Sequence, residues 1–418
     1  MASDLGVLRF LTCGSVDDGK STLIGRLLYD TKALLTDTIA TLERNAQRRG
    51  LSAVDLSLLT DGLVAEREQG ITIDVAYRYF ATARRKFIIA DSPGHVQYTR
   101  NMVTAASTAD AAVLLVDARK GILPQTRRHA TIAGLLGVRH MIVAVNKMDL
   151  VDFERARFEE IVAEFRAWLE NQPGLHVQVE YLPLSALEGA NVVDRDPRLG
   201  WFAGPTLIEL LEQAPAHEAD VNAPLRLPVQ WVCRPSQADF RGYAGRVESG
   251  SVAVGDEIVV FPSGRRTRVQ SIGIGTQARE HAVAGESVMV TLADDVDISR
   301  GDILAGVEDA PLASQRVEAR VCWLNQRPLD ARREYVLRQA ARETRVRIGA
   351  TRARLDIEKL QWHEDGAGVE ANDIVRMELQ TQNPLAADEY ARFRTTGSFI
   401  LVDPASNETV AAGMIGAG

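Results

Sequence analysis

The sequence predicts an α/β domain with a mostly parallel sheet and helices on both faces, followed by two antiparallel β-barrel domains. From residue 7 to about 213, short apolar runs alternate with helix-length amphipathic segments, whereas beyond a proline-containing linker the runs are short and separated by glycines. Alternating strands and helices are typical of parallel sheets. Short strands without helical periodicity are typical of closed barrels.

The first part contains four runs that we expect to be strands and two segments that we expect to be helices. Each run is short, apolar and bounded by polar or turn residues, as buried strands are. The strands are VLRFLTC at 7–13, KFIIAD at 86–91, AAVLLVD at 111–117 and RHMIVAVN at 139–146, and the helices are FEEIVAEFRAWLE at 158–170 and TLIELLEQ at 206–213.

The linker APAHEADVNAPLR at 214–226 interrupts this alternation with prolines and small residues. About 190 residues follow, which suits two barrels, and EDAPLASQ at 308–315 lies where one barrel should end and the next begin. We therefore expect the α/β domain at 1–215 and the barrels at 224–309 and 310–418.

Composition bounds the class of protein. Apolar residues make up 46% of the 418-residue chain, charged residues 25%, and the net charge is −8, so no bulk polyanion partner is indicated. Cys13, Cys233 and Cys322 show no paired spacing, which argues against a zinc site or a disulfide framework, and Cys13 should be a core residue. Without a long apolar segment, a cytoplasmic protein with no membrane partner is expected.

The segment GSVDDGKST at 14–22 matches the phosphate-loop pattern GxxxxGK[ST], and it lies after a predicted strand. Its glycines let backbone N–H groups close around phosphate oxygens, Lys20 neutralises the β and γ phosphates, and the Ser21 hydroxyl binds Mg²⁺. Asp17 and Asp18 raise a question, because a phosphate binder should avoid extra negative charge.

A second motif, DSPGH at 91–95, follows the predicted strand 86–91. Asp91 stands at the strand end, where its carboxylate can hold the Mg²⁺ shell. Gly94 can offer its N–H to a γ-phosphate because glycine adopts the backbone conformations that close approach requires.

A third motif, NKMD at 146–149, selects the base. A fixed Asp149 carboxylate accepts from guanine N1–H and from the exocyclic amine together, whereas adenine would leave it unpaired. SAL at 185–187 should close over the guanine. We therefore expect a GTP or GDP site made of Gly14, Ser15, Val16, Asp17, Asp18, Gly19, Lys20, Ser21, Thr22, Asp91, Pro93, Gly94, His95, Asn146, Lys147, Met148, Asp149, Ser185, Ala186 and Leu187.

At these motifs the chain resembles the translation-factor class of GTPases, and the resemblance continues through both barrels. EREQGITID at 66–74 is similar to the first switch of that class, which implies that Thr72 is a ligand of Mg²⁺ and of the γ-phosphate. The resemblance also implies that His95 orients the attacking water behind an apolar gate of Val16 and Ile71. The expected catalytic residues are His95, Lys20 and Thr72, and the expected metal ligands are Ser21, Thr72 and Asp91.

The two acids of the phosphate loop differ in what the resemblance says of them. The translation factors also have an acid at the position of Asp17, which implies a monovalent cation held against the phosphates; a solvated or backbone-bonded Asp17 stays equally open. Asp18 departs from those factors, which usually have histidine. The segment 8–32 instead resembles the large, GTP-hydrolysing subunits of bacterial sulfate adenylyltransferases.

Further segments outside the α/β domain are similar to the same family. They are PVQWVCRP at 228–235, DFRGYAGRVESGSVAVGD at 239–256, DISRGD at 297–302 and FILVDPASNETVAAGM at 399–414. The family implies a smaller partner subunit that binds ATP and sulfate and joins them into adenosine 5′-phosphosulfate and pyrophosphate, while this chain hydrolyses GTP to drive that synthesis. The sequence fits this division, because it has one phosphate loop and neither an SGGxD-type loop nor an HxGH signature.

Two alternatives share the nucleotide motifs. One is a translation elongation factor that delivers aminoacyl-tRNA, and the other is a regulatory switch without useful GTP turnover. The arginine-rich stretch 332–347 could touch RNA, but acids dilute it, so nucleic acid is not the expected partner.

Some aromatic and basic residues have simpler expected roles. Trp231, Trp323 and Trp362 should fill barrel cores or domain contacts, with an exposed partner anchor as the other option. ARRK at 83–86 should be a solvated hairpin tip between two strands.

Overall fold

The computed structural model describes most of the chain, in two compact units. The first unit comprises residues 1–217 and the second comprises 218–356 and 361–418. The described residues are 6–33, 56, 75–93, 99–172, 175–216, 220–234, 240–275, 277–356, 361–364 and 368–416.

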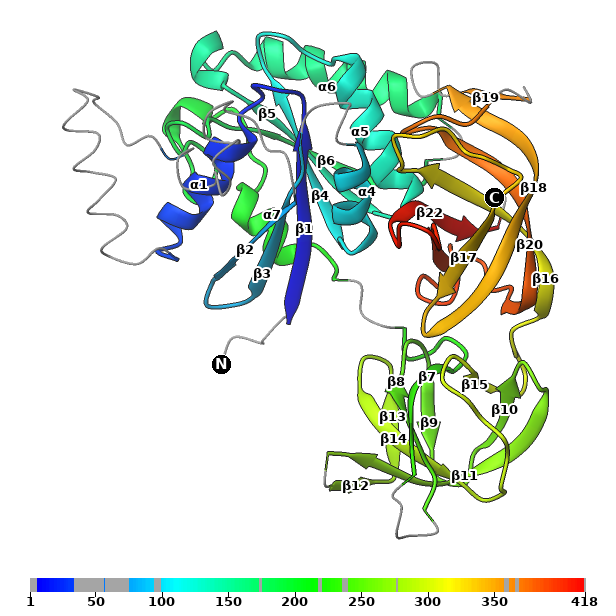
Figure 1. The fold of residues 1–418 in the computed structure, drawn as a ribbon. Coiled ribbons are helices and arrows are strands. Elements are labelled where there is room, and N and C mark those ends of the chain that lie inside the picture. Colours follow the sequence, from blue (N-terminus) through cyan, green and yellow to red (C-terminus); the bar gives the residue numbers. More distant parts are fainter. Residues whose placement is uncertain are drawn as a thin grey trace. The chain divides into compact units, whose positions relative to one another are not determined.

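A six-stranded sheet forms the centre of the first unit (Figure 1). Its order is β2-β3-β1-β4-β5-β6, and every neighbouring pair is parallel except β2 and β3. The strands are β1 (Val7–Gly14), β2 (Ala76–Ala81), β3 (Lys86–Asp91), β4 (Ala111–Asp117), β5 (His140–Asn146) and β6 (Gln178–Pro183). All four predicted strands are confirmed.

Helices cover both faces of this sheet. One face packs against α1 and α7 in a core that also holds Leu8 and Phe10 of β1, while α4, α5 and α6 lie on the other face (Figure 1). The helices are α1 (Lys20–Asp30), α4 (Thr99–Ser107), α5 (Pro124–Leu135), α6 (Arg155–Glu170) and α7 (Leu207–Gln213), with short 3-10 helices η3 (Met148–Val151) and η4 (Pro197–Leu199). In the described part of the chain, no helix has the length and apolar character needed to cross a membrane.

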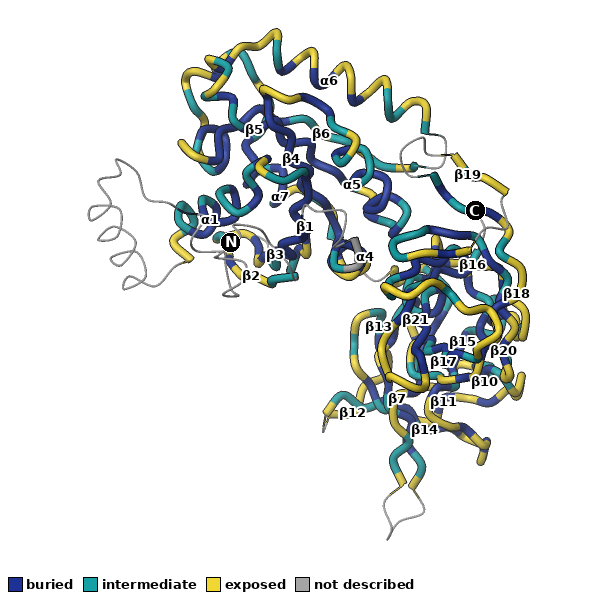
Figure 2. The backbone as a smooth tube through the Cα atoms, turned by 45° about the horizontal axis from the view of Figure 1, so that its top comes forward, coloured by how far each residue is buried: buried dark blue, intermediate teal, exposed yellow. Residues whose placement is uncertain are grey.

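The two predicted helices follow from their sequences. In α6 the buried residues Phe158, Ile161, Val162 and Phe165 recur at helical spacing, so one stripe faces the sheet and the opposite stripe is exposed (Figure 2). Helix α7 begins with a capping box, in which the Thr206 hydroxyl and the carboxylate of the third helical residue each accept a backbone N–H.

The second unit contains two closed antiparallel barrels, which confirms the predicted fold class. In the first barrel, β10 pairs with β11 and so closes the order β10-β15-β7-β8-β14-β11. Its strands are β7 (Arg226–Cys233), β8 (Gly242–Arg246), β10 (Glu257–Phe261), β11 (Arg265–Ile274), β14 (Ser287–Leu292) and β15 (Ile303–Gly306), with short strands β9 (Ser251–Ala253), β12 (Gln277–Arg279) and β13 (His281–Val283) beside them.

The second barrel closes in the same way, by pairing β17 with β18 around the order β17-β21-β22-β16-β20-β18. Its strands are β16 (Ala313–Trp323), β17 (Glu334–Gln339), β18 (Arg342–Asp356), β20 (Ile374–Ala386), β21 (Ser398–Val402) and β22 (Thr409–Ile415), and the short strand β19 (Gln361–His363) pairs antiparallel with the end of β18. Each barrel encloses its own apolar core.

A buried ion pair joins the two barrels. Arg226 of β7 donates from Nε and Nη2 to the two carboxylate oxygens of Asp388, both at 2.8 Å, and the Thr396 hydroxyl donates to the same carboxylate at 2.5 Å. The guanidinium lies 4.3 Å from the ring centre of Phe393. Both charged side chains are almost fully buried, so each depends on the other for compensation.

The burial of three tryptophans and of Arg85 can be compared with the roles expected from the sequence. Trp323 is buried in the second barrel, as expected, and Trp362 stacks on the Arg376 guanidinium at 4.3 Å. The core role is wrong for Trp231, which is 60% exposed because it faces outward on β7. The solvated role is wrong for Arg85, which is buried and donates to the carbonyl oxygens at the end of α7.

Removing one partner of the inter-barrel ion pair should strongly destabilise the second unit. Arg226→Ala or Asp388→Ala leaves a buried charge without compensation, which costs about 3–5 kcal/mol. The combined replacement Arg226→Met with Asp388→Leu should lose less than either single variant, because neither charge remains. Urea denaturation of the full chain measures these losses.

The matched control for this prediction is Arg155→Ala, which removes an exposed ion pair with Glu159 and should change stability little. Equal losses from the buried and the exposed pair would contradict the prediction.

Candidate functional site

The sequence motifs meet at one edge of the parallel sheet. Strands β1, β3 and β5 end at Gly14, Asp91 and Asn146, and they run in the same direction. Ligands of open α/β sheets bind at the carboxyl ends of the strands. The phosphate loop, the described start of the DSPGH segment (91–93) and the NKMD segment therefore face a common site.

The phosphate loop requires its two glycines. Gly19 has φ +95°, and a Cβ there would lie 2.5 Å from the Asn146 side-chain nitrogen. Gly14 has φ +150°, and a Cβ there would lie 2.8 Å from the Leu115 carbonyl oxygen. Helix α1 begins directly afterwards at Lys20, so its first N–H groups and its dipole point toward the loop.

The Lys20 ammonium group lies across the loop. Its Nζ donates to the carbonyl oxygens of Gly14 and Ser15, at 3.0 and 2.8 Å. Burial lowers the pKa of Lys20, and the carboxylates of Asp91 and Asp18 oppose that shift. A buried cation next to a helix N-terminus is what an anionic phosphate group needs as a counter-charge.

The two loop acids face different ways. Asp18 is buried, and its Oδ2 accepts the Ser15 N–H at 2.6 Å, while its Oδ1 accepts no hydrogen bond within the described residues. Burial raises the pKa of Asp18, against the opposing effects of Lys20 and the Ser15 N–H. Asp17 is exposed and has φ +67°. Asp18 therefore braces the back of the loop, which explains how an acid can be accommodated there.

The Asn146 side chain joins three loops of the site. Its Nδ2 donates to the Asp18 carbonyl oxygen at 2.7 Å, and its Oδ1 accepts the Ala186 N–H at 2.9 Å. The side chain is buried, so these hydrogen bonds are shielded from water. The phosphate loop, the end of β5 and the SAL segment are thereby held in one arrangement.

Asp149 and Lys147 are also held by neighbours. The Ser185 hydroxyl donates to Asp149 Oδ1 at 2.5 Å, and this fixes the carboxylate predicted to recognise guanine. Lys147 Nζ donates to the Asp17 carbonyl oxygen and lies 3.0 Å from the Asp117 carboxylate. The NKMD segment is thus tied to the phosphate loop a second time.

Asp91 is buried at the end of β3, where its Oδ1 accepts from the Thr12 hydroxyl at 3.2 Å. Ser21 lies half-buried at the start of α1. Pro93 and Met148 are buried, Val16 and Thr22 are half-buried, and Leu187 is exposed. The predicted residues Thr72, Gly94 and His95, and Ile71 of the apolar gate, lie outside the described residues.

Sequence reasoning missed four residues that support the site. Asp117 is buried, and Arg119 donates to it from Nε and Nη2 at 3.0 and 2.7 Å. Burial disfavours the Asp117 carboxylate, but the hydrogen bonds from Arg119 and Lys147 outweigh burial and hold its pKa well below the usual range. His129 of α5 accepts a hydrogen bond from the phosphate loop at Gly14, and Gln125 of the same helix contacts the His129 ring. Only the position of Asp117 at a strand end could have suggested any of them.

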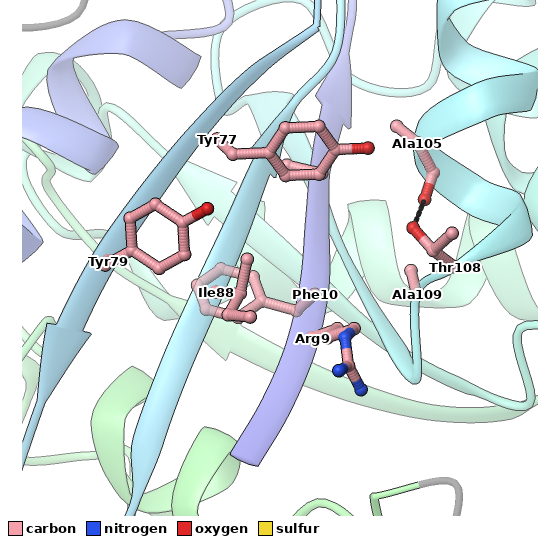
Figure 3. Close-up of a pocket in the computed structure, with 9 residues that line it drawn as sticks. Arg9, Phe10, Tyr77, Tyr79, Ile88, Ala105, Thr108 and Ala109 are labelled. Carbon is pink, nitrogen blue, oxygen red and sulfur yellow. Dashed lines mark hydrogen bonds between the residues drawn. The ribbon is translucent and has the colours of Figure 1, made fainter. Parts of the chain in front are cut away.

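A separate hollow of about 270 Å³ lies beside β2 and the end of α4 (Figure 3). Its lining is mostly apolar, and it includes the partly exposed rings of Tyr77 and Tyr79. The lining residues are Arg9, Phe10, Tyr77, Tyr79, Ile88, Ala90, Ala105, Thr108 and Ala109. None of the motif residues is among them, so this hollow is distinct from the phosphate loop.

The buried imidazole of His129 should make stability depend on pH. Burial, with Lys20 and Arg128 nearby, lowers the pKa of His129 from 6.5 to about 3. Between these values the unfolded chain binds the extra proton, so the free energy of unfolding should fall as the pH drops below about 6.5. From about pH 7.5 to about pH 5.5 this residue should account for a loss of about 1.4 kcal/mol.

Chemical denaturation of the native chain and of His129→Asn at the two pH values measures this loss of unfolding free energy. The difference between the two chains separates the contribution of His129 from those of other titrating groups. The native chain should lose more stability than the variant. An equal loss in both chains would contradict the assignment of a buried, neutral imidazole.

Three known protein families match successive parts of the chain. The Elongation factor Tu GTP binding domain matches residues 6–217, Elongation factor Tu domain 2 matches 243–305, and the GTP-eEF1A C-terminal domain-like family matches 316–416. Among solved structures, sup35 complexed with GMPPNP is 25% identical, with a TM-score of 0.44, over 99% of this chain and 94% of that chain.

Curated relatives give a narrower family. Sulfate adenylyltransferase subunit 1 of Aeromonas hydrophila is 50% identical over 412 residues, which are 98% of this chain and 86% of that protein. The protein of the same name from Salmonella typhimurium is 49% identical over 411 residues, which are 98% of this chain and 85% of that protein. The chain therefore belongs to the sulfate adenylyltransferase subunit 1 family, and its first 217 residues contain the elongation factor Tu type of GTP-binding domain.

Proposed function

We propose that this chain is the GTP-hydrolysing subunit of a heteromeric sulfate adenylyltransferase. GTP hydrolysis here would drive the formation of adenosine 5′-phosphosulfate and pyrophosphate from ATP and sulfate on a smaller catalytic partner subunit, in the cytoplasm. The observation that supports this most directly is the identity of about 49% to proteins of that name over nearly the whole chain. The site geometry supports the nucleotide half of the proposal.

The chemistry of the site suits a guanine nucleotide with Mg²⁺. The proposed metal ligands Ser21, Asp91 and Thr72 all offer oxygen atoms, which Mg²⁺ prefers. Bound Mg²⁺ would neutralise charge on the β and γ phosphates. Lys20 adds a buried positive charge at the same place, and Asp17 is an exposed acid that could hold a monovalent cation beside the phosphates.

Hydrolysis of GTP needs little covalent chemistry from the protein, because positioning and charge neutralisation supply most of the rate enhancement. We assign the positioning of the attacking water to His95, with Val16 and Ile71 as the apolar gate. Contacts of Thr72 and Gly94 with the γ-phosphate would order their segments, and that order would bias the barrels or the partner subunit.

We propose the domain limits 1–215, 224–309 and 310–418. The first barrel strand begins at Arg226, the last strand of that barrel ends at Gly306, and the next barrel begins at Ala313, all of which suit these limits. Delivery of aminoacyl-tRNA is the less supported alternative, because the relatives of about 49% identity have the sulfate adenylyltransferase name.

The proposal predicts a coupling that can be measured on the chain with its co-purifying partner. Pyrophosphate release that requires ATP and sulfate should rise on addition of GTP, and GTP hydrolysis should rise on addition of ATP and sulfate. His95→Ala should reduce GTP hydrolysis by about 100-fold, in the range of a lost general acid–base or water-positioning group, with nearly unchanged GTP binding.

Three results would each contradict a part of this proposal. GTP turnover independent of the partner, ATP and sulfate would remove the coupling. Co-purification of tRNA in place of an adenylylating protein would favour the elongation factor alternative. If His95→Ala weakens GTP binding as much as it slows hydrolysis, its assigned role is wrong.

A further inference from the structure

His129 reaches the phosphate loop from a different part of the fold. Helix α5 places its imidazole behind β1, where the ring is 2% exposed. The Gly14 N–H donates to His129 Nδ1 at 3.1 Å, although the two residues are 115 positions apart in the sequence. Gly14 is the first glycine of the phosphate loop, so this hydrogen bond fixes the point at which the loop leaves the sheet.

The hydrogen bond also determines the tautomer of the ring. Because Nδ1 accepts, the neutral imidazole must have its hydrogen on Nε2. The Gln125 side chain lies one helical turn before His129, and its Nε2 is 2.8 Å from His129 Nε2. An amide nitrogen only donates, so the hydrogen on His129 Nε2 assigns the opposite orientation to the Gln125 amide, in which the amide oxygen faces the ring and accepts that hydrogen. Gln125 thus orients the ring, and the ring in turn holds Gly14.

The next N–H of the chain is held in a similar way. The Ser15 N–H donates to the buried carboxylate of Asp18. Two consecutive N–H groups at the loop entrance are therefore bound to side chains behind the loop. The N–H groups at the start of α1 have no partner within the helix, and they stay available to phosphate oxygens.

We propose that His129, oriented by Gln125, is a positioning residue that presets the phosphate loop for nucleotide through the Gly14 N–H. This inference rests on the proposed guanine nucleotide function and adds a residue to its site. A buried N–H without an acceptor is costly, so loss of His129 Nδ1 should let the loop leave its present geometry. The nucleotide would then have to restore that geometry on binding, and affinity would fall.

Two substitutions separate the hydrogen bond from mere packing. In His129→Asn the side-chain oxygen can stand where Nδ1 stands and still accept from Gly14. In His129→Gln the amide is one carbon further out, near the position of Nε2, so the acceptor for Gly14 is lost although more side-chain volume remains. If packing alone mattered, His129→Gln would keep more nucleotide affinity than His129→Asn. If the hydrogen bond matters, His129→Asn would keep more.

The experiment is a titration of the full chain with the fluorescent nucleotide mant-GDP, together with GTP hydrolysis at saturating GTP. His129→Gln should raise the Kd by about tenfold, and His129→Asn should recover most of that affinity, to within about threefold of the native chain. The kcat should change by less than about twofold in both variants, since the residue touches no reacting group. Thermal melting of the same samples verifies that each variant is folded.

The outcomes distinguish the proposals. Equal affinity of folded His129→Gln and the native chain would overturn the role of His129 and leave the proposed function intact. A loss in His129→Asn as large as in His129→Gln would also overturn it, because packing would then explain both. No binding of mant-GDP by the native chain would overturn the proposed function and this inference together.

Discussion

The nucleotide site depends on the buried side-chain amide of Asn146. This one group donates to the carbonyl oxygen of Asp18 and accepts the N–H of Ala186, and its backbone ends β5. The phosphate loop, the base-recognition segment and the SAL segment come from distant parts of the chain. The amide and the Lys147 contacts tie these segments together at the carboxyl edge of the sheet.

Burial of charge behind the loop is the second constraint. Lys20, Asp18, Asp91 and Asp117 are all buried within the same small region. Each has an opposite charge or a donor nearby, as buried ionised groups require. His129 avoids adding charge there, because burial and the neighbouring Lys20 and Arg128 favour its neutral form. Asp18, which seemed out of place in a phosphate loop, is thus part of this compensated network, whereas Asp17 lies exposed outside it.

The sequence was most informative where short local patterns decide the structure. The strands, the helices α6 and α7, the two barrels and the spacing of the nucleotide motifs follow from local periodicity and from glycine and lysine positions. The contacts of Gly14 with His129 and of Lys147 with Asp117 could not be predicted, because they join residues far apart in the chain. A single histidine on a helix has no pattern that distinguishes a structural from a positioning role.

Side-chain burial in the barrels and hairpins was also beyond local pattern. Trp323 of β16 and Trp231 of β7 both lie on barrel strands, yet Trp323 is buried in a core and Trp231 faces outward. The direction depends on the register of each strand, where a shift of one residue reverses the face. Arg85 is similar: its sequence neighbours are charged and exposed, but the carbonyl groups at the end of α7 lie within reach and hold its guanidinium in a buried position.

The role of the Asn146 amide is tested most directly by calorimetric titration with GDP, which compares the Kd of Asn146→Asp with that of the native chain. The change keeps the shape and the acceptor for Ala186, but it replaces the donor to Asp18 by a charged oxygen. If the amide holds the pocket together, the Kd should rise by about 100-fold or more while the melting behaviour shows a folded chain. A folded variant that binds GDP within about threefold of the native chain would contradict the account.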